Sequence, residues 1–245
     1  MKSIEFITEI NEKHKQVFEQ MRIAYNLDAE TMNKIVILAQ DYNITLTLIE
    51  PLIQIGQNCK YYLNEVNYDA FKLFRGLQKY VGDFSKKQTR LTEREPQGMG
   101  LDLQQRLNEY FTEYYGSPFR NAMFCTGNEN ETETFGDTYI VFPINKFKYL
   151  WSTDINDINY AFSNWLHNID RDERIKLNRD ESSKNFKFMN EIITKSNYKT
   201  TDLLHGIQSN NEIMIRCKEY YVLSNTAMPK GNAVKAMIEI LKLAK

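Results

Sequence analysis

Apolar residues recur at helical spacing from residue 3 to about residue 66. Phe18, Met21 and Tyr25 form one such series, and a second series begins after Asp28. This spacing gathers apolar side chains on one face of a helix, and Asp is a preferred helix N-cap. We therefore predict a helical N-terminal region in which Asp28 caps the second helix.

Two features of this region lead to further predictions. The stripe of the first helix starts at Ile4 and Ile7 and includes His14, which is expected to be a core or rim residue rather than a ligand. The segment Thr47-Leu48-Ile49-Glu50 has the form of a capping box ahead of Pro51. It predicts that another helix starts there.

From residue 71 onward, short apolar runs bounded by polar turn residues replace the helical spacing. Runs of this kind are typical of β-strands. The predicted strands are Phe71–Leu77, Ala122–Gly127, Thr138–Ile144, Phe147–Trp151, Glu212–Cys217 and Tyr220–Leu223. Only a short polar break separates the last two runs, so we predict that they form a hairpin.

Helices and loops are expected between these strands. Helical stripes predict helices at Leu101–Tyr115, at Ile155–Leu166 with Ser152 as N-cap, and at Asn232–Lys245. The charged stretches Lys86–Gly100 and His167–Asn185 show no stripe and are predicted to be exposed loops. The fold class is therefore α+β, with a helical annex at 1–66 and a sheet-based domain at 67–245.

Composition and charge favour some classes of protein over others, and they leave binding to nucleic acid unsupported without excluding it. The 245 residues are 42% hydrophobic, which favours a packed globule over disorder. The formal charge is −1, from 31 basic and 32 acidic side chains, so no net field would attract nucleic acid or an anionic membrane. The sequence shows no signal-peptide pattern and no run of membrane-spanning length, so we expect a cytoplasmic protein.

The three cysteines, Cys59, Cys125 and Cys217, are widely spaced and lie in apolar segments. This usage favours buried thiols in a reducing compartment over disulfides or a zinc site. No metal is therefore expected.

Three of the predicted strands carry a chemically distinctive residue at one end. Arg75 is followed by Gly76, Thr126 is followed by Gly127, and Glu212 stands at the entrance of an apolar strand after a polar turn. Glycine has no Cβ, so a ligand can approach the backbone there. A carboxylate at the edge of a sheet core costs folding energy unless an interaction stabilises it.

The order Arg, hydroxyl, Glu resembles that of the Arg–Ser/Thr–Glu mono-ADP-ribosyltransferases of the bacteriophage and toxin type. The acidic segment Glu129–Phe135 and the strand after it look like the helix and strand that follow the family's Ser-Thr-Ser strand. Asn210-Asn211-Glu212 is similar to the family's Glu/Gln-x-Glu turn. The resemblance spans roughly residues 71–223 and implies a split β-sheet core that binds NAD.

The resemblance also implies a role for each residue. Glu212 would be the catalytic carboxylate, Arg75 would bind the diphosphate of NAD with Gly76 making room, and Thr126 would orient Glu212 by hydrogen bonding. Aromatic faces near the nicotinamide ring would come from Phe135 or Tyr139, and Arg90 or Arg94 would be further phosphate contacts. Asn210 would lie on the acceptor side.

Two positions depart from the family pattern. Cys125-Thr126 stands where the family has serine, and Ser152, also at a strand end before a helix, is the alternative hydroxyl. Asn210 replaces the family's Glu or Gln and is a poor general base. The sequence therefore leaves three possible acceptors of ADP-ribose: a protein, a nucleic acid or water. A non-catalytic module with this fold and an NAD glycohydrolase are the alternative functions.

Overall fold

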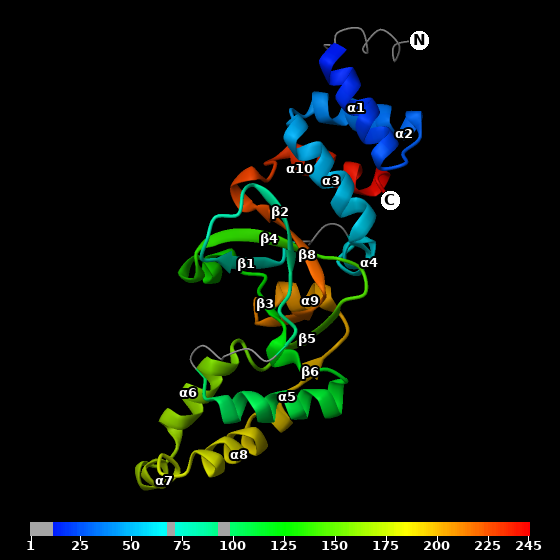
Figure 1. Ribbon diagram of the computed structural model, residues 1–245. Helices are drawn as coiled ribbons and strands as arrows, with labels where there is room; N and C mark the ends of the chain where they lie inside the picture. Colours follow the sequence, from blue (N-terminus) through cyan, green and yellow to red (C-terminus); the bar gives the residue numbers. More distant parts are fainter. Residues whose placement is uncertain (1–11, 68–71, 93–98) are drawn as a thin grey trace. The chain divides into compact units, whose positions relative to one another are not determined.

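The computed structural model of the protein describes residues 12–67, 72–92 and 99–245 (Figure 1). The chain forms two compact units. The first consists of Met1–Lys60 and Met228–Lys245, and the second of Tyr61–Ala227. Each unit is described separately below. The predicted residues Ile4, Ile7, Phe71 and Arg94 lie outside the described ranges.

The first unit is helical. Its helices are α1 (Glu12–Ala24), α2 (Ala29–Asp41), α3 (Leu46–Asn58) and α10 (Asn232–Leu243). Helices α3 and α10 pack so closely that a Cβ on Gly56 would stand 2.7 Å from the Leu241 carbonyl oxygen. The C-terminal helix thus joins the N-terminal helices in one unit, whereas the sequence grouped it with the sheet domain at 67–245.

The predicted cap of α2 is confirmed, because Asp28 Oδ1 accepts a hydrogen bond from Thr31 N at 2.7 Å. The predicted capping box at Thr47 is wrong. Helix α3 begins at Leu46, with Thr45 as its N-cap, and Pro51 lies inside the helix. The buried apolar face that includes Ile49 and Leu52 outweighs the cost of the proline. His14 is exposed and belongs to no packed face.

The second unit contains two antiparallel sheets of four strands each within the described residues. One sheet has the order β1-β4-β8-β2 and the other β3-β7-β5-β6. The strands are β1 (Phe74–Leu77), β2 (Phe84–Gln88), β3 (Met123–Cys125), β4 (Asp137–Pro143), β5 (Lys148–Ser152), β6 (Tyr198–Lys199), β7 (Ile213–Arg216) and β8 (Glu219–Ser224). The predicted α+β class is therefore correct.

Helices cover the β3-β7-β5-β6 sheet. The helices of this unit are α4 (Lys60–Glu65), α5 (Leu101–Tyr115), α6 (Ile158–Asn168), α7 (Arg171–Leu177), α8 (Glu181–Glu191) and α9 (Leu203–Gln208). Leu107 of α5, Trp165 of α6 and Phe188 of α8 share one buried cluster with Met214 of the sheet. Helices α5 and α8 lie side by side (Figure 1).

Short 3₁₀ turns complete the unit: η2 (Phe119–Asn121), η3 (Glu129–Phe135), η4 (Ile193–Lys195) and η5 (Asn225–Ala227). The turn η3 follows β3, as the sequence predicted for Glu129–Phe135. Its contacts with β1 form one wall of the site described below.

The predicted hairpin of the last two strands is wrong. Strand β7 pairs with β3 and β5, whereas β8 pairs with β4 and β2. The chain therefore passes from one sheet to the other between Arg216 and Glu219. A hairpin turn and a crossing between two sheets can have the same short polar sequence. They differ only in which strands pair on either side, and the local sequence does not show this.

Both predicted loops contain regular structure. Residues 84–88 form edge strand β2, in which the Phe84 ring stacks on Tyr221 at 5.1 Å and Lys86 pairs with Glu219 at 3.0 Å. Residues 167–185 include α7 and the first five residues of α8, and the N-caps of these helices are Asp170 and Asp180. Edge strands and exposed helices bury too little apolar surface to show a clear hydrophobic period.

Other local predictions can be compared with the structure. The helix at Leu101–Tyr115 is confirmed residue for residue as α5. The N-cap of α6 is Asp157 rather than Ser152, because Asp157 Oδ1 accepts from Tyr160 N at 2.7 Å and Ser152 ends β5. The three cysteines are free and buried, as predicted. No helix in the described ranges combines the length and apolar character needed to cross a bilayer.

Candidate active site

The two sheets of the second unit meet at one isolated bridge between Phe74 and Thr126. Phe74 N donates to Thr126 O at 2.8 Å, and Thr126 N donates to Phe74 O at 3.0 Å. On the other side of β3, Cys125 is paired with Ile213, the residue that follows Glu212. This junction therefore brings Arg75, Thr126 and Glu212 to the same place.

All three residues line one cavity of about 410 Å³. Its walls come from β1, β3, η2, η3, α5 and the start of α6, with Glu212 at the entrance of β7. The volume falls in the range of about 300–1,000 Å³ that is usual for small-molecule sites. The arginine, the hydroxyl residue and the glutamate thus line one cavity, and all three belong to the second unit.

Arg75 enters the cavity from β1. Its Nη1 atom donates to the main-chain oxygen of Phe124 at 3.2 Å. Its Nε atom is buried and has no hydrogen-bond partner. Arg75 lines the cavity, and a guanidinium in that position is suited to bind an anionic ligand because its planar fork can contact two oxygens.

Glu212 is largely buried, with 13% of its side chain exposed. Its Oε1 atom accepts a hydrogen bond from Arg120 Nη1 at 3.0 Å, and its main-chain nitrogen donates to Asn156 O at 2.8 Å. Burial raises the pKa of the carboxyl from 4.5 to about 7, while Arg120 opposes this shift and the charge of Asp157 adds to it. Glu212 can therefore change its charge near neutral pH.

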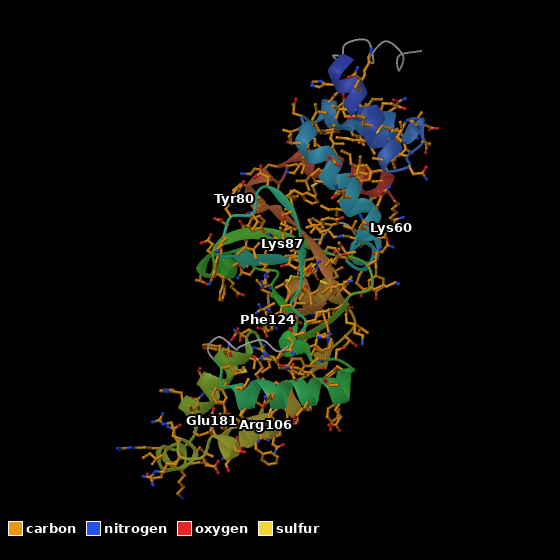
Figure 2. The ribbon with its side chains drawn as sticks, viewed as in Figure 1. Lys60, Tyr80, Lys87, Arg106, Phe124 and Glu181 are labelled. Carbon is orange, nitrogen blue, oxygen red and sulfur yellow. The ribbon has the colours of Figure 1, made fainter. Side chains whose placement is uncertain are left out.

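Arg120 is the main site residue that the sequence analysis missed. It belongs to η2, has 5% of its side chain exposed, and its guanidinium lies over the Phe124 ring at 4.5 Å from the centroid. Phe124, labelled in Figure 2, thus contacts both arginines of the cavity. The sequence signal that could have found it is a charged residue between the apolar residues Phe119 and Ala122. The predicted site rested on the ends of predicted strands, and Arg120 does not lie at one.

Thr126 does not hydrogen-bond to Glu212, although the resemblance implied this. Its hydroxyl donates to Asn210 O at 2.9 Å and lies 3.3 Å from Glu131 Oε2, and it accepts from Asn128 N at 3.1 Å. The hydroxyl therefore fixes the turn that precedes Glu212. Its influence on the carboxylate passes through the backbone of that turn.

Of the other residues predicted to contact the cofactor, Phe135 lines the cavity, whereas Tyr139 and Arg90 do not. Phe135 lines the cavity and is 63% exposed. Tyr139 is fully buried in β4, does not line the cavity, and accepts from Val81 N at 3.1 Å. It is a core residue because every residue from Tyr139 to Phe142 is buried. Arg90 is exposed and lies outside the cavity lining.

Gly76 lines the cavity, but the space its Cβ would occupy is filled by protein. A Cβ there would overlap the Thr132 carbonyl oxygen and stand 2.7 Å from Phe135 Cβ. The glycine thus allows η3 to pack against β1. We had expected it to admit a ligand to the backbone, and the packing of η3 is the physical reason for the difference.

Asn210 does not line the cavity. Its backbone has φ 62°, in the left-handed region, which asparagine adopts more readily than glutamate or glutamine. The next residue, Asn211, donates from Nδ2 to Ser152 O at 2.7 Å. The backbone of this turn thus gives a reason for asparagine at 210 that is independent of the acceptor.

Ser152 also lies beside the turn, but outside the cavity. It is 1% exposed, and its hydroxyl accepts from Asp154 N at 3.0 Å. Of the two candidate hydroxyl residues, only Thr126 lines the cavity that Glu212 lines.

The cavity combines two arginines with three carboxylates, Glu131, Asp157 and Glu212. In the part of the chain that the structure describes, no three His, Cys, Asp or Glu side chains are grouped so that they could hold a metal ion. Burial raises the pKa of the Cys125 thiol to about 12, so this cavity cysteine is a poor nucleophile at neutral pH. The groups suited to chemistry are therefore the arginines and the buried glutamate.

Comparison of the chain with protein-family models, with curated proteins and with solved structures found no match.

Proposed function

We propose that the protein is an NAD-dependent mono-ADP-ribosyltransferase with an ADP-ribosyltransferase-like split-sheet core. One observation carries the proposal. Arg75, Thr126 and Glu212 are separated by 51 and 86 residues in the sequence, yet they line one cavity where the two sheets meet. Their order along the chain is the one on which the resemblance rests. Thr126 directly follows β3 and Glu212 directly precedes β7, whereas Arg75 is the second residue of β1 and not the last residue of a strand as the sequence predicted.

The chemistry fits a buried carboxylate. Breaking the bond between nicotinamide and ribose passes through a transition state close to an oxocarbenium ion, in which positive charge grows on the ribose. A fixed carboxylate that accepts a hydrogen bond from the ribose 2′-hydroxyl stabilises that charge more than the ground state. Glu212 takes this role in the proposal.

Arg75 binds the diphosphate of NAD in the proposal. It lines the cavity from β1, whereas Glu212 stands at the entrance of β7. Phe135, exposed at the cavity, provides an aromatic face for the nicotinamide ring. Thr126 holds the turn before Glu212 through the Asn210 carbonyl.

The acceptor of ADP-ribose is a host macromolecule, a protein or a nucleic acid, and the enzyme acts in the cytoplasm as a phage or toxin-type effector. No metal takes part in the proposed reaction. The class of acceptor and the role as an effector rest on the resemblance.

The test measures nicotinamide release from NAD by the purified chain and transfer of label from adenylate-labelled NAD into cell lysate. Treating the labelled product separately with protease and nuclease identifies the class of acceptor. We expect both release and incorporation. Release without incorporation would instead indicate an NAD glycohydrolase, and a chain that neither binds NAD nor releases nicotinamide would indicate a non-catalytic module.

A further inference from the structure

Arg120 and Glu212 form a buried ion pair inside the candidate active site. Arg120 Nη1 donates to Glu212 Oε1 at 3.0 Å, and the two side chains are 5% and 13% exposed. Among the described residues, this is the one hydrogen bond that the carboxylate accepts. The second oxygen, Oε2, therefore remains able to accept a hydrogen bond from a ligand in the cavity.

Arg120 is held by contacts that do not involve Glu212. Its main-chain nitrogen donates to Asn108 Oδ1 of α5 at 2.8 Å, and Asn108 Nδ2 donates to Asn121 Oδ1 at 3.1 Å. Its guanidinium lies over the Phe124 ring. Helix α5 and strand β3 thus fix the arginine before any ligand binds, as preorganised sites require.

The surroundings of Glu212 oppose its negative charge. Burial and Asp157, at the start of α6, favour the protonated form. The buried Cys125 thiol on the neighbouring strand β3 and the Tyr198 hydroxyl on β6 of the same sheet have raised pKa values, so both stay neutral near pH 7. The cavity contains one further carboxylate, Glu131 on η3, and two cations, Arg75 and Arg120. Arg120 is the cation in contact with Glu212.

We propose that Arg120 is a positioning residue for the reaction: it keeps the Glu212 carboxylate charged and holds Oε1, so that Oε2 is presented to the ribose 2′-hydroxyl. This inference rests on the proposed function for its catalytic consequence. Removing one partner of a buried ion pair leaves an uncompensated charge, and a carboxyl then takes up a proton. A protonated Glu212 cannot stabilise an oxocarbenium ion electrostatically.

The experiment compares Arg120→Gln, Arg120→Lys and Arg216→Gln in the full chain. Arg216 is the matched control, because it is a half-buried arginine at the opposite end of β7 from Glu212, donates to Pro118 O at 3.5 Å and does not line the cavity. Carbon-13 NMR of the labelled carboxyl groups, with Glu212→Gln to assign the signal, gives the pKa of Glu212. The pH profile of nicotinamide release is measured in parallel.

We expect Arg120→Gln to raise the pKa of Glu212 by at least about one unit and to lower kcat/KM below pH 7 by about tenfold for each unit, with recovery at higher pH. Arg120→Lys keeps the positive charge, so the pKa of Glu212 in this variant should lie between its values in the wild type and in Arg120→Gln. This variant remains informative if Arg120→Gln does not fold. Arg216→Gln should match the wild type in both measurements.

An unchanged Glu212 pKa in Arg120→Gln would overturn the inference. So would a raised KM for NAD with an unchanged pH profile, because Arg120 would then bind the phosphates instead. If the wild type releases no nicotinamide, the proposed function fails. The NMR titration still decides independently whether Arg120 sets the charge of Glu212.

Discussion

Glu212 shows at the scale of one residue why its position in the sequence was informative. A carboxylate directly before a buried strand has its pKa raised to about 7, and its one side-chain hydrogen bond comes from a buried arginine. Groups with strongly shifted pKa values in a cavity are candidates for function, because catalytic acids and bases need pKa values matched to their task. The properties of this residue therefore support the enzyme proposal.

Substituting Glu212 with glutamine tests that role. Glu212→Gln keeps the size and hydrogen bonding of the side chain but removes the charge that would face the oxocarbenium ion. We expect kcat for nicotinamide release to fall by about 10²–10³ with little change in NAD affinity. Nicotinamide release is followed kinetically and NAD affinity by calorimetry. Full activity in this variant would remove Glu212 from the mechanism.

Arg75→Ala should have the complementary effect. In the proposal, the contacts of Arg75 with the diphosphate already form in the ground state, so the loss of this arginine should weaken NAD binding and raise KM before it lowers kcat. Calorimetry of NAD binding is the deciding measurement. Wild-type affinity in Arg75→Ala would show that another group binds the diphosphate.

At the scale of elements, the wall between β1 and η3 depends on one glycine. A Cβ on Gly76 would overlap the Thr132 carbonyl oxygen and stand 2.7 Å from Phe135 Cβ. We expect Gly76→Ala to destabilise the second unit by about 1–3 kcal/mol through overpacking, and to weaken NAD binding because η3 must move.

Urea denaturation followed by tryptophan fluorescence measures this effect, because Trp151 and Trp165 both belong to the second unit. Gly100→Ala is the matched control, since a Cβ at Gly100 would meet only the end of the Glu181 side chain, which can turn away. Equal destabilisation by both variants would contradict the packing role of Gly76.

At the scale of the whole molecule, the buried glutamate links stability to pH. The pKa of Glu212 is raised in the folded protein, from 4.5 to about 7. The folded state therefore binds the proton more tightly than the unfolded state. The resulting stabilisation is fully present below about pH 4.5 and is lost as the pH rises through about 7.

We expect the free energy of unfolding of the wild type, relative to Glu212→Gln, to fall by at most about 3 kcal/mol across this window, at about 1.4 kcal/mol per pKa unit. The same tryptophan signal in urea, recorded at several pH values, gives the difference. The proposed activity should rise over the same window, because only the ionised carboxylate stabilises the transition state. A difference that does not change with pH would contradict the shifted pKa.

The sequence by itself determined the local elements that bury a clear apolar face and the order of the three candidate residues. Helix α5, strand β4 and the cap at Asp28 follow from periodicity and capping chemistry, which act over a few neighbouring residues. Arg75, Thr126 and Glu212 were recognisable because each stands at or beside the end of an apolar run.

Only the tertiary structure decided which segments and side chains of the chain contact one another. The crossing of the chain from β7 to β8, the packing of η3 on Gly76 and the ion pair between Arg120 and Glu212 all join segments distant in sequence. Arg120 and Glu212 are 92 residues apart, and no local pattern encodes which charge a buried carboxylate will meet. That choice follows from strand pairing and burial, which are properties of the folded chain as a whole.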